Sequence, residues 1–195
     1  MALCNHHASS RGRIHRDQTC RHGNGRGRAR EALTYLIRER FFRSGEDSNI
    51  TDDQGRPLLH VDAKALSLRN RLVLRDPEGK EVAHVLRKLT AHRPTYEVAL
   101  GGQEATEIRK DLVTPFGDRF TIDLPGPDEL EVRGNLFGHE FTIRRGDQTV
   151  ATIFKRWLTM PDTYELDVAP GQDDLLMLAS VLALDLAEDQ ERKQR

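Results

Sequence analysis

The body of this sequence contains no cysteine, because Cys4 and Cys20 are the only two and both lie within the first 20 residues. A disulfide framework therefore cannot support the fold, and the core has to be held together by packing alone. An apolar N-terminal stretch of signal-peptide length is also absent, since polar and charged residues follow Leu3. We therefore expect a cytoplasmic protein.

Outside the N-terminal segment, basic side chains are outnumbered by acidic ones. The chain has 30 Lys and Arg against 31 Asp and Glu, but residues 1–30 hold seven Arg and a single acidic residue, Asp17. Subtracting that segment leaves 23 basic and 30 acidic side chains, a balance of about −7. Because general nucleic-acid binding depends on a net basic surface, we expect no nucleic acid to bind the body of the chain.

Residues 1–32 are predicted to be a disordered, basic tail rich in Arg, Gly and His, because their few apolar groups cannot offset the entropy of ordering. A disordered arm that touches nucleic acid is an alternative for 21–30. The tail also holds residues of metal-ligand type, but without the paired spacing of a zinc finger, so we expect no metal and no cofactor. These residues are Cys4, His6, His7, Cys20 and His22.

Motifs of catalytic sites are missing as well, since neither a nucleophile elbow nor a phosphate-binding glycine loop occurs. An acid/base pair could be assembled from His139 and Glu140, with Glu165 and Asp167 elsewhere in the chain. In alternating strands such residues are more often solvated surface. We therefore expect no catalytic residue.

What the sequence does contain is a series of short strands separated by polar turns. Turn signals at 52–55, 76–79, 101–102 and 145–147 separate runs rich in Val, Ile, Thr, Tyr and Phe. Apolar and charged residues alternate at period two in several runs, as in strands with one wet face. Twelve strands are predicted, at 35–42, 48–52, 57–61, 72–75, 81–89, 94–99, 104–110, 119–123, 129–134, 140–144, 148–157 and 162–168.

An internal repeat links two of the predicted hairpins. Residues 82–98 match residues 150–166 without a gap, at an offset of 150 − 82 = 68, with five identical positions and six conservative exchanges. Two similar meanders therefore form the sheet in this interpretation.

The longest apolar run spans Leu175–Ala187, in which only Ser180 and Asp185 are polar. These two residues lie on different sides of a helix, so the helix has no polar face toward solvent. Other elements must therefore surround it. At about 20 Å it is too short for the ~30 Å hydrocarbon core of a bilayer, and we expect no transmembrane segment. The sequence predicts this helix over 173–187. Its predicted core residues are Leu175, Leu178, Val181 and Leu182.

Closure of the strands into a barrel accounts for both the series of short strands and the apolar helix. A barrel removes exposed sheet edges, but at about twelve strands its interior is too wide for side chains alone to fill. We expect the apolar helix to occupy the barrel interior. The predicted fold is mainly β: a closed antiparallel barrel of about twelve strands around a central hydrophobic C-terminal α-helix. The domain covers 33–190, and a charged tail follows at 191–195.

The segment TYLIRERFFRSGEDSNITDDQGRPLLHVDAKALSLRNRLVLRDPEGKEVAHVLRKL, the later TYEV and TYELDV, and the closing apolar helix resemble the LURP-one-related family, including its bacterial members, across about 34–190. That family is similar in fold to the tubby C-terminal domain and the phospholipid scramblases. The resemblance implies a twelve-stranded barrel around a central helix. Tubby-like domains bind phosphoinositide headgroups, which implies a lipid as a candidate ligand by fold analogy.

Basic pairs at equivalent places in the two repeats are the predicted ligand-binding residues: Arg87, Lys88, Lys155 and Arg156. They could present two related cationic patches to phosphate groups. Because adjacent strand residues point to opposite faces, the alternative is that one member of each pair lies at a barrel end or meets a carboxylate.

Two further residues have open interpretations. Trp157 is expected in the core or at the barrel rim, with a stacking platform as the alternative. Asp185 marks either an exposed helix end or the polar floor of a ligand pocket.

The predicted function is a non-catalytic binding or scaffold module, with an anionic phospholipid surface or a phosphorylated ligand as the specific candidate partner. The alternatives are a protein–protein interaction module without a small ligand, and a hydrolase that uses His139 or Glu140.

Overall fold

The computed structural model describes residues 32–38, 48–62, 71–88, 93–103, 105–111, 117–135, 140–155 and 163–194. Within them the chain forms twelve strands followed by a long helix, α3 (Asp174–Gln194). The strands are β1 (Leu33–Arg38), β2 (Ser48–Asp52), β3 (Pro57–Asp62), β4 (Arg71–Arg75), β5 (Glu81–Lys88), β6 (Thr95–Leu100), β7 (Thr106–Lys110), β8 (Asp118–Asp123), β9 (Glu129–Asn135), β10 (Glu140–Arg145), β11 (Gln148–Lys155) and β12 (Thr163–Val168).

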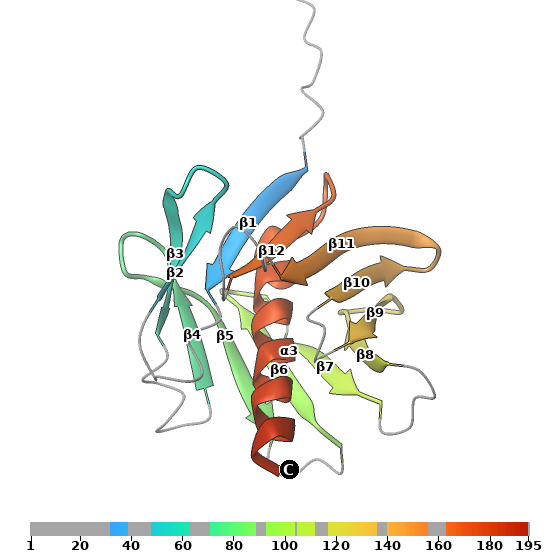
Figure 1. Cartoon of the computed structure of the whole chain (residues 1–195). Helices are drawn as coiled ribbons and strands as arrows, with labels where there is room; N and C mark the ends of the chain where they lie inside the picture. The colour runs from blue at the N-terminus through green and yellow to red at the C-terminus, as the bar shows by residue number, and fades with distance from the viewer. Residues whose placement is uncertain are drawn as a thin grey trace, which may run out of the picture.

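All twelve strands form one closed antiparallel barrel, in which each strand pairs with its neighbours in sequence and β1 closes the ring by pairing with β12. α3 runs through the middle of this barrel (Figure 1). The predicted fold class is therefore confirmed. The strand bounds differ from the predicted ones by a few residues at most. The predicted strand ends at 39–42, 89, 104, 156–157 and 162 lie outside the described residues.

The strands have the inside–outside alternation that the period-two pattern predicts. In β6, for example, Tyr96, Val98 and Leu100 are buried and Glu97 and Ala99 are half-buried. Inward residues of this kind from all twelve strands form one hydrophobic cluster with the helix. The barrel interior is thus a packed core.

The two hairpins that match in sequence also pair in the same register. In β5–β6, Val85 lies opposite Val98; in β11–β12, Ile153 lies opposite Leu166. Both pairs are separated by the offset of 68 found in the sequence, as 85 + 68 = 153 and 98 + 68 = 166. The internal repeat as a duplication of the chain stays a prediction.

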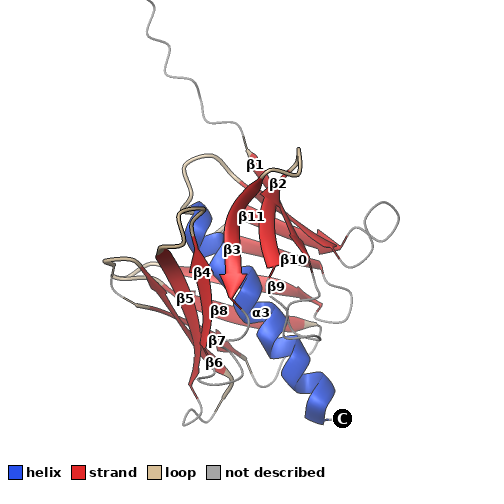
Figure 2. Ribbon diagram, turned by 90° about the vertical axis from the view of Figure 1, so that its left-hand side faces the viewer, coloured by secondary structure: helices blue, strands red, loops and turns tan. Residues whose placement is uncertain are grey.

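Helix α3 is buried on all sides over most of its length (Figure 2). All residues from Leu176 to Leu184 are buried, including the predicted core residues Leu178, Val181 and Leu182. Leu175, in the first turn of the helix, is half-buried. Ser180 satisfies its hydroxyl by donating to the carbonyl of Leu176 at 2.8 Å. The predicted core role of this helix is therefore confirmed.

Both ends of α3 have polar anchors. Asp173 precedes the helix and accepts a hydrogen bond from the backbone N–H of Leu176 at 3.0 Å, as an N-cap residue does. The predicted end at 187 is wrong, because the helix continues to Gln194 and includes most of the predicted charged tail 191–195. The charged turns are held by the Lys193–Asp189 pair at 2.6 Å, and by Lys110, which contacts Glu191.

Candidate functional site: a groove between β3 and β4

The closed barrel has a groove in its wall where β3 extends past the end of β4. Among the residues that the structure describes, the ladder between these strands covers three residue pairs, from His60 opposite Arg75 to Asp62 opposite Val73. β4 ends at Arg75 and turns away into the β4–β5 connection, whereas β3 extends further, back to Pro57. The first half of β3 therefore runs alongside a turn rather than a strand, and a groove of about 390 Å³ lies between them.

A β-bulge shapes the floor of this groove. Ile50 of β2 lies opposite Leu59, but the next residue, Thr51, lies opposite Pro57, so Leu58 is the extra residue. Bulges re-aim side chains, and here two successive leucines, Leu58 and Leu59, are both half-buried and packed against the core cluster. The two leucines that line the groove thus pack against the hydrophobic core.

The opposite wall is the tight turn between β4 and β5. Asp76 accepts the backbone N–H of Lys80 at 2.8 Å, and the backbone N–H of Gly79 donates to the carbonyl of Asp76 at 2.9 Å. Gly79 has a φ of 84°, a conformation that favours glycine. Pro77 in the same turn adds an apolar surface to the groove.

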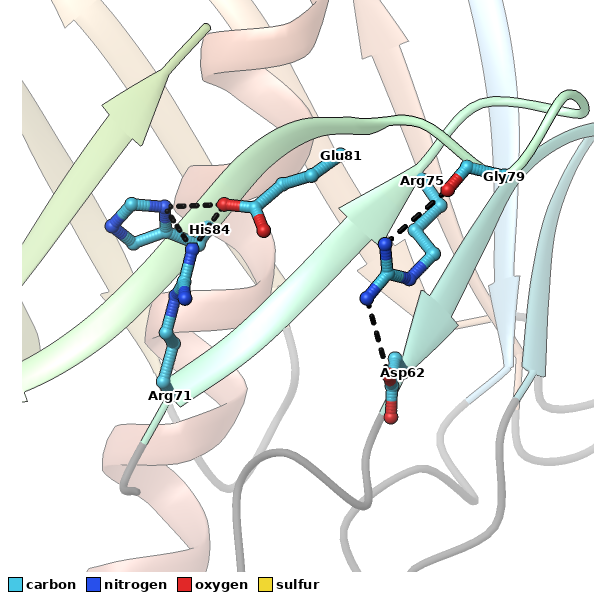
Figure 3. A network of polar contacts seen from close by, with 6 residues as sticks. All are labelled: Asp62, Arg71, Arg75, Gly79, Glu81 and His84. Carbon is cyan, nitrogen blue, oxygen red and sulfur yellow. Dashed lines mark hydrogen bonds and ion pairs between the residues drawn. The ribbon is translucent and has the colours of Figure 1, made fainter. Parts of the chain in front are cut away.

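Arg75 lies at the rim where the groove meets the outer face of the barrel. Its guanidinium donates to the carbonyl of Gly79 at 3.2 Å and lies 3.7 Å from a carboxylate oxygen of Asp62 (Figure 3). The second contact is long for an ion pair, and the Arg75 side chain is 35% exposed. Nearby on β3, His60 contacts the side-chain amide oxygen of Asn49 at 3.2 Å through Nδ1.

A second cationic group lies at the other end of β4, where the strand begins. Arg71 contacts both Glu81 and Nδ1 of His84, and that same nitrogen lies 2.9 Å from Glu81 (Figure 3). This three-residue cluster is internally paired. Of the two arginines, Arg75 has the weaker contacts and the groove beside it.

The predicted pair Arg87 and Lys88 is split between the two faces of β5. Lys88 points outward and pairs with Glu97 at 3.2 Å and with Glu107. The hydrogen bond from Lys88 lowers the pKa of Glu107, and the same bond raises the pKa of Lys88. Lys88 thus meets carboxylates, as the alternative interpretation expected.

Arg87 lies on the inward face of β5, opposite the buried Tyr96, at the barrel end where the last turns of α3 emerge. Burial raises the pKa of Tyr96 to about 12, and the positive charge of Arg87 opposes this shift. Also at this end, Lys110 lies 2.8 Å from Asp118 and 5.6 Å from the ring centroid of Phe120. This barrel end is therefore closed by charged groups.

The equivalent pair in the second repeat has little structural description. Lys155 lies opposite Tyr164 in β11–β12, as Arg87 lies opposite Tyr96, but its side chain is outside the described residues. Arg156 is outside them altogether. The four predicted ligand-binding residues are therefore not brought into one patch by the described side chains.

The other predicted candidates are dispersed. Glu140 is exposed, and Asp167 accepts a hydrogen bond from the hydroxyl of Thr34 at 2.7 Å. His139, Trp157 and the Cys and His residues of the tail lie outside the described residues. In the part of the chain that is described, no three His, Cys, Asp or Glu residues gather as a metal site would need.

Asp185 lies inside the barrel and lines a small cavity. It accepts a hydrogen bond from the Tyr164 hydroxyl at 3.1 Å, and Glu188, one turn further along α3, lines the same cavity. The cavity has a volume of about 10 Å³, roughly the space that one water molecule needs. It is too small for an organic ligand.

The sequence contained a signal for the groove that the strand pattern alone did not convey. Pro57, Leu58 and Leu59 place three apolar residues in a row at the start of a predicted strand, which breaks the period-two alternation. Proline in a strand indicates an edge or a bulge. Together they mark a place where the sheet is irregular.

The closed twelve-stranded barrel around a buried helix defines a protein of the tubby-like fold class, and the groove in its wall is a feature suited to binding. The chain belongs to the LURP-one-related family, whose family profile matches residues 33–185. The family resemblance inferred from the sequence is therefore confirmed. Family and fold together indicate a binding module.

Two known proteins are similar to this chain. The uncharacterized protein YxjI of Bacillus subtilis (strain 168) is 27% identical over 154 residues, which are 79% of this chain and 93% of that protein. The X-ray structure of Arabidopsis thaliana protein AT5G01750 is similar with a TM-score of 0.59 and 17% identity, over 80% of this chain and 91% of that chain. The second likeness supports the fold alone.

Among the described residues, no helix is both long enough and apolar enough to cross a bilayer.

Proposed function

We propose that this protein is a non-catalytic binding module for an anionic, phosphate-bearing ligand, and that the ligand binds at the groove between β3 and β4. The observation that carries the proposal is the position of Arg75, a partly exposed guanidinium at the rim of a groove of about 390 Å³. Small-ligand pockets typically have volumes of ~300–1,000 Å³, and arginine presents a fork of donors that matches phosphate.

The electrostatics of the outer face support this choice over the surface near Lys88. There, cations and carboxylates alternate: Lys88 pairs with Glu97 and Glu107, and Arg109 pairs with Asp123. A phosphate binding at Lys88 would have to displace two carboxylates. At Arg75 it competes with the carboxylate of Asp62 at 3.7 Å, while Asp76, which also lines the groove, accepts the backbone N–H of Lys80.

Isothermal titration calorimetry with glycerol 3-phosphate tests the proposal. Arg75→Gln should weaken binding by about 1.5–3 kcal/mol, which is roughly a 10- to 150-fold change in affinity, because it removes a charged hydrogen-bond donor. Arg119→Gln is the matched control, since Arg119 is an exposed arginine on β8. Equal affinities of the wild type and Arg75→Gln would refute the proposal.

The four residues predicted from the repeats provide a second arm of the same experiment. Charge reversal at Arg87, Lys88, Lys155 and Arg156 together should leave the affinity for glycerol 3-phosphate unchanged if Arg75 holds the phosphate. A loss of binding in this variant, with Arg75→Gln unaffected, would move the site to these residues.

A protein–protein interaction module is the second candidate, because the first half of β3 lies beyond the three-pair ladder with β4. Such a strand edge can pair with an extended segment of a partner. Pro57 lacks a backbone N–H, so it removes one donor from this edge. A stable protein that co-purifies with the wild type but not with a variant in which Leu58 is proline would favour this function.

A further inference from the structure

One wall of the groove is a strand edge that β4 does not cover. Residues 57–59 of β3 lie alongside β2 on one side, and on the other side the ladder with β4 stops at His60 opposite Arg75. Among the described residues, no backbone hydrogen bond joins 57–59 to the turn at 76–80 across the groove. Two of the three edge residues have both a backbone N–H and a C=O, since only Pro57 lacks the N–H. The groove is therefore lined by backbone groups of the kind that pair with a neighbouring strand.

The side chains beside this edge differ between the two faces of the sheet. Arg75 and His60 lie opposite each other. Both face the outside of the barrel, because the residues next to them, Leu74 and Val61, are fully buried. Leu59 faces inward by the same alternation, and it is half-buried. A strand added beside β3 would therefore place alternate side chains next to a cation and over a leucine.

Resting on the proposed function, we infer that the phosphate belongs to a phosphoserine in an extended protein segment, which pairs with the edge of β3 while its phosphate contacts Arg75. In this mode of recognition, main-chain hydrogen bonds provide affinity and side-chain pockets provide specificity. A short phosphorylated side chain is sufficient, because the segment continues the line of β4 directly beyond Arg75.

Alternation of side chains also defines the residues around the phosphoserine. The residues before and after it point inward, where Leu59 and the turn residue Pro77 line the groove. Apolar side chains at these two positions gain from burial there. The recognised motif is therefore an apolar residue, phosphoserine and a second apolar residue.

A phospholipid is the competing occupant, and the strand edge favours it less. An alkyl chain has no hydrogen-bonding groups, so it would cover the N–H and C=O groups of the edge without bonding to them, which costs free energy. A peptide backbone bonds to these groups, and its apolar side chains still cover Leu59.

Titration calorimetry with the capped peptide acetyl-Thr-Val-pSer-Val-Thr-amide tests the inference. We expect it to bind at least tenfold more tightly than glycerol 3-phosphate, because net hydrogen bonds contribute roughly two- to tenfold each and strand pairing adds several. The unphosphorylated peptide should bind at least tenfold more weakly than the phosphopeptide, because it lacks the charged hydrogen bonds to Arg75. Octyl phosphate, used below its micelle-forming concentration, represents the lipid and should also bind more weakly than the phosphopeptide.

Backbone N-methylation of the peptide separates strand pairing from other contacts. Successive N–H groups of a strand point to opposite edges, so methylation of both valines and methylation of the phosphoserine block opposite edges of the peptide. Both methylated peptides retain the phosphate and all side chains. We expect one of the two to bind at least about fivefold more weakly than the parent peptide, through its lost hydrogen bonds to β3.

Hydrogen exchange in the wild-type protein reports on the edge itself. The amide of Leu58 or Leu59 should exchange at least fivefold more slowly when the phosphopeptide is bound, and saturating glycerol 3-phosphate should not slow it. Arg75→Gln should abolish this protection at the same peptide concentration. Arg119→Gln, on β8, is the matched control and should retain it.

The outcomes separate this inference from the proposed function. If glycerol 3-phosphate binds in an Arg75-dependent way but the phosphopeptide binds no more tightly, or neither N-methylation weakens it, the peptide inference is overturned and the phosphate site stands. Tighter binding of octyl phosphate than of the phosphopeptide overturns the inference in favour of a lipid. If the phosphopeptide binds equally well to the wild type and to Arg75→Gln, the phosphate site is overturned instead.

Discussion

Arg75 and Asp62 show how one weak ion pair can leave a cation available for a ligand. The guanidinium and the carboxylate are 3.7 Å apart, and both side chains are partly exposed, so their mutual attraction is screened by solvent. Asp62 competes with an incoming phosphate for Arg75 and also repels it. The carboxylate therefore limits the affinity of the proposed site.

Removing that carboxylate should strengthen binding. We expect Asp62→Asn to tighten the binding of glycerol 3-phosphate up to about fivefold, the effect of the ~0.2–1 kcal/mol that exposed ion pairs contribute. Asp123→Asn is the matched control, because Asp123 also pairs with an arginine, Arg109, but on β8. Weaker binding in Asp62→Asn, measured by calorimetry, would contradict a phosphate site at Arg75.

The pairing of Lys88 with Glu107 predicts a pH dependence of stability. Lys88 lowers the pKa of Glu107 below its ordinary 4.5, so this contribution is present above pH 4.5 and is lost as the pH falls through the lowered value. The pKa of Lys88 is raised above 10.5 through its hydrogen bonds to Glu107 and Glu97, so the contribution persists to pH 10.5 and is lost as the pH rises further.

Lys88→Met should therefore destabilise the fold by no more than the ~0.2–1 kcal/mol of a partly exposed pair at pH 7, and the difference from wild type should shrink below pH 4.5. Urea unfolding at a series of pH values measures this. A difference that grows toward acid pH would show that Glu107 is not the partner that matters.

Helix α3 is the element on which the barrel interior depends. Leu182 is fully buried in it, and its side chain belongs to the cluster formed with the strands. Leu182→Ala should destabilise the protein by about 2–5 kcal/mol, through lost burial and the cavity left behind. Leu33→Ala is the matched control, because Leu33 is 45% exposed, and should change stability by less than about 0.5 kcal/mol. Denaturant unfolding of both variants compares them directly.

The elements that the sequence predicted well are those set by local pattern. Alternation in segments such as β8 and β9 and the all-apolar run of α3 each determine which faces are buried, so their positions followed from the residues alone. The C-terminal extension of α3 could not be predicted in this way, because its charged turns are stabilised by Lys110, more than 75 residues earlier in the chain. Apolar periodicity contains no information about such a contact.

The groove was missed for a related reason. It arises because β4 ends at Arg75 while β3 continues past it, and the relative length of two paired strands is a property of their register. The cationic pairs were predicted from their places in the repeat, but the carboxylates that meet Lys88 come from β6 and β7. Residues on neighbouring strands determine which cations are paired with carboxylates. The sequence alone does not show which residues lie opposite each other on adjacent strands.

The barrel and its helix should fold only together. Closure creates an interior wider than strand side chains can fill, and α3 occupies it. Truncation after Gln172 should therefore abolish cooperative thermal unfolding, as followed by near-UV circular dichroism and calorimetry. A truncated protein that still melts in one cooperative transition would contradict the central role of the helix.

The proposed phosphate site lies in the groove between β3 and the β4–β5 turn. Two-dimensional ¹H–¹⁵N NMR during titration with glycerol 3-phosphate tests the proposed phosphate site most directly. The shifts of backbone amides should change for residues 58–62 and 75–80, and Arg75→Gln should abolish these changes. Shifts confined to the strands around Lys88, or an unchanged spectrum at saturating ligand, would contradict a phosphate site in the groove.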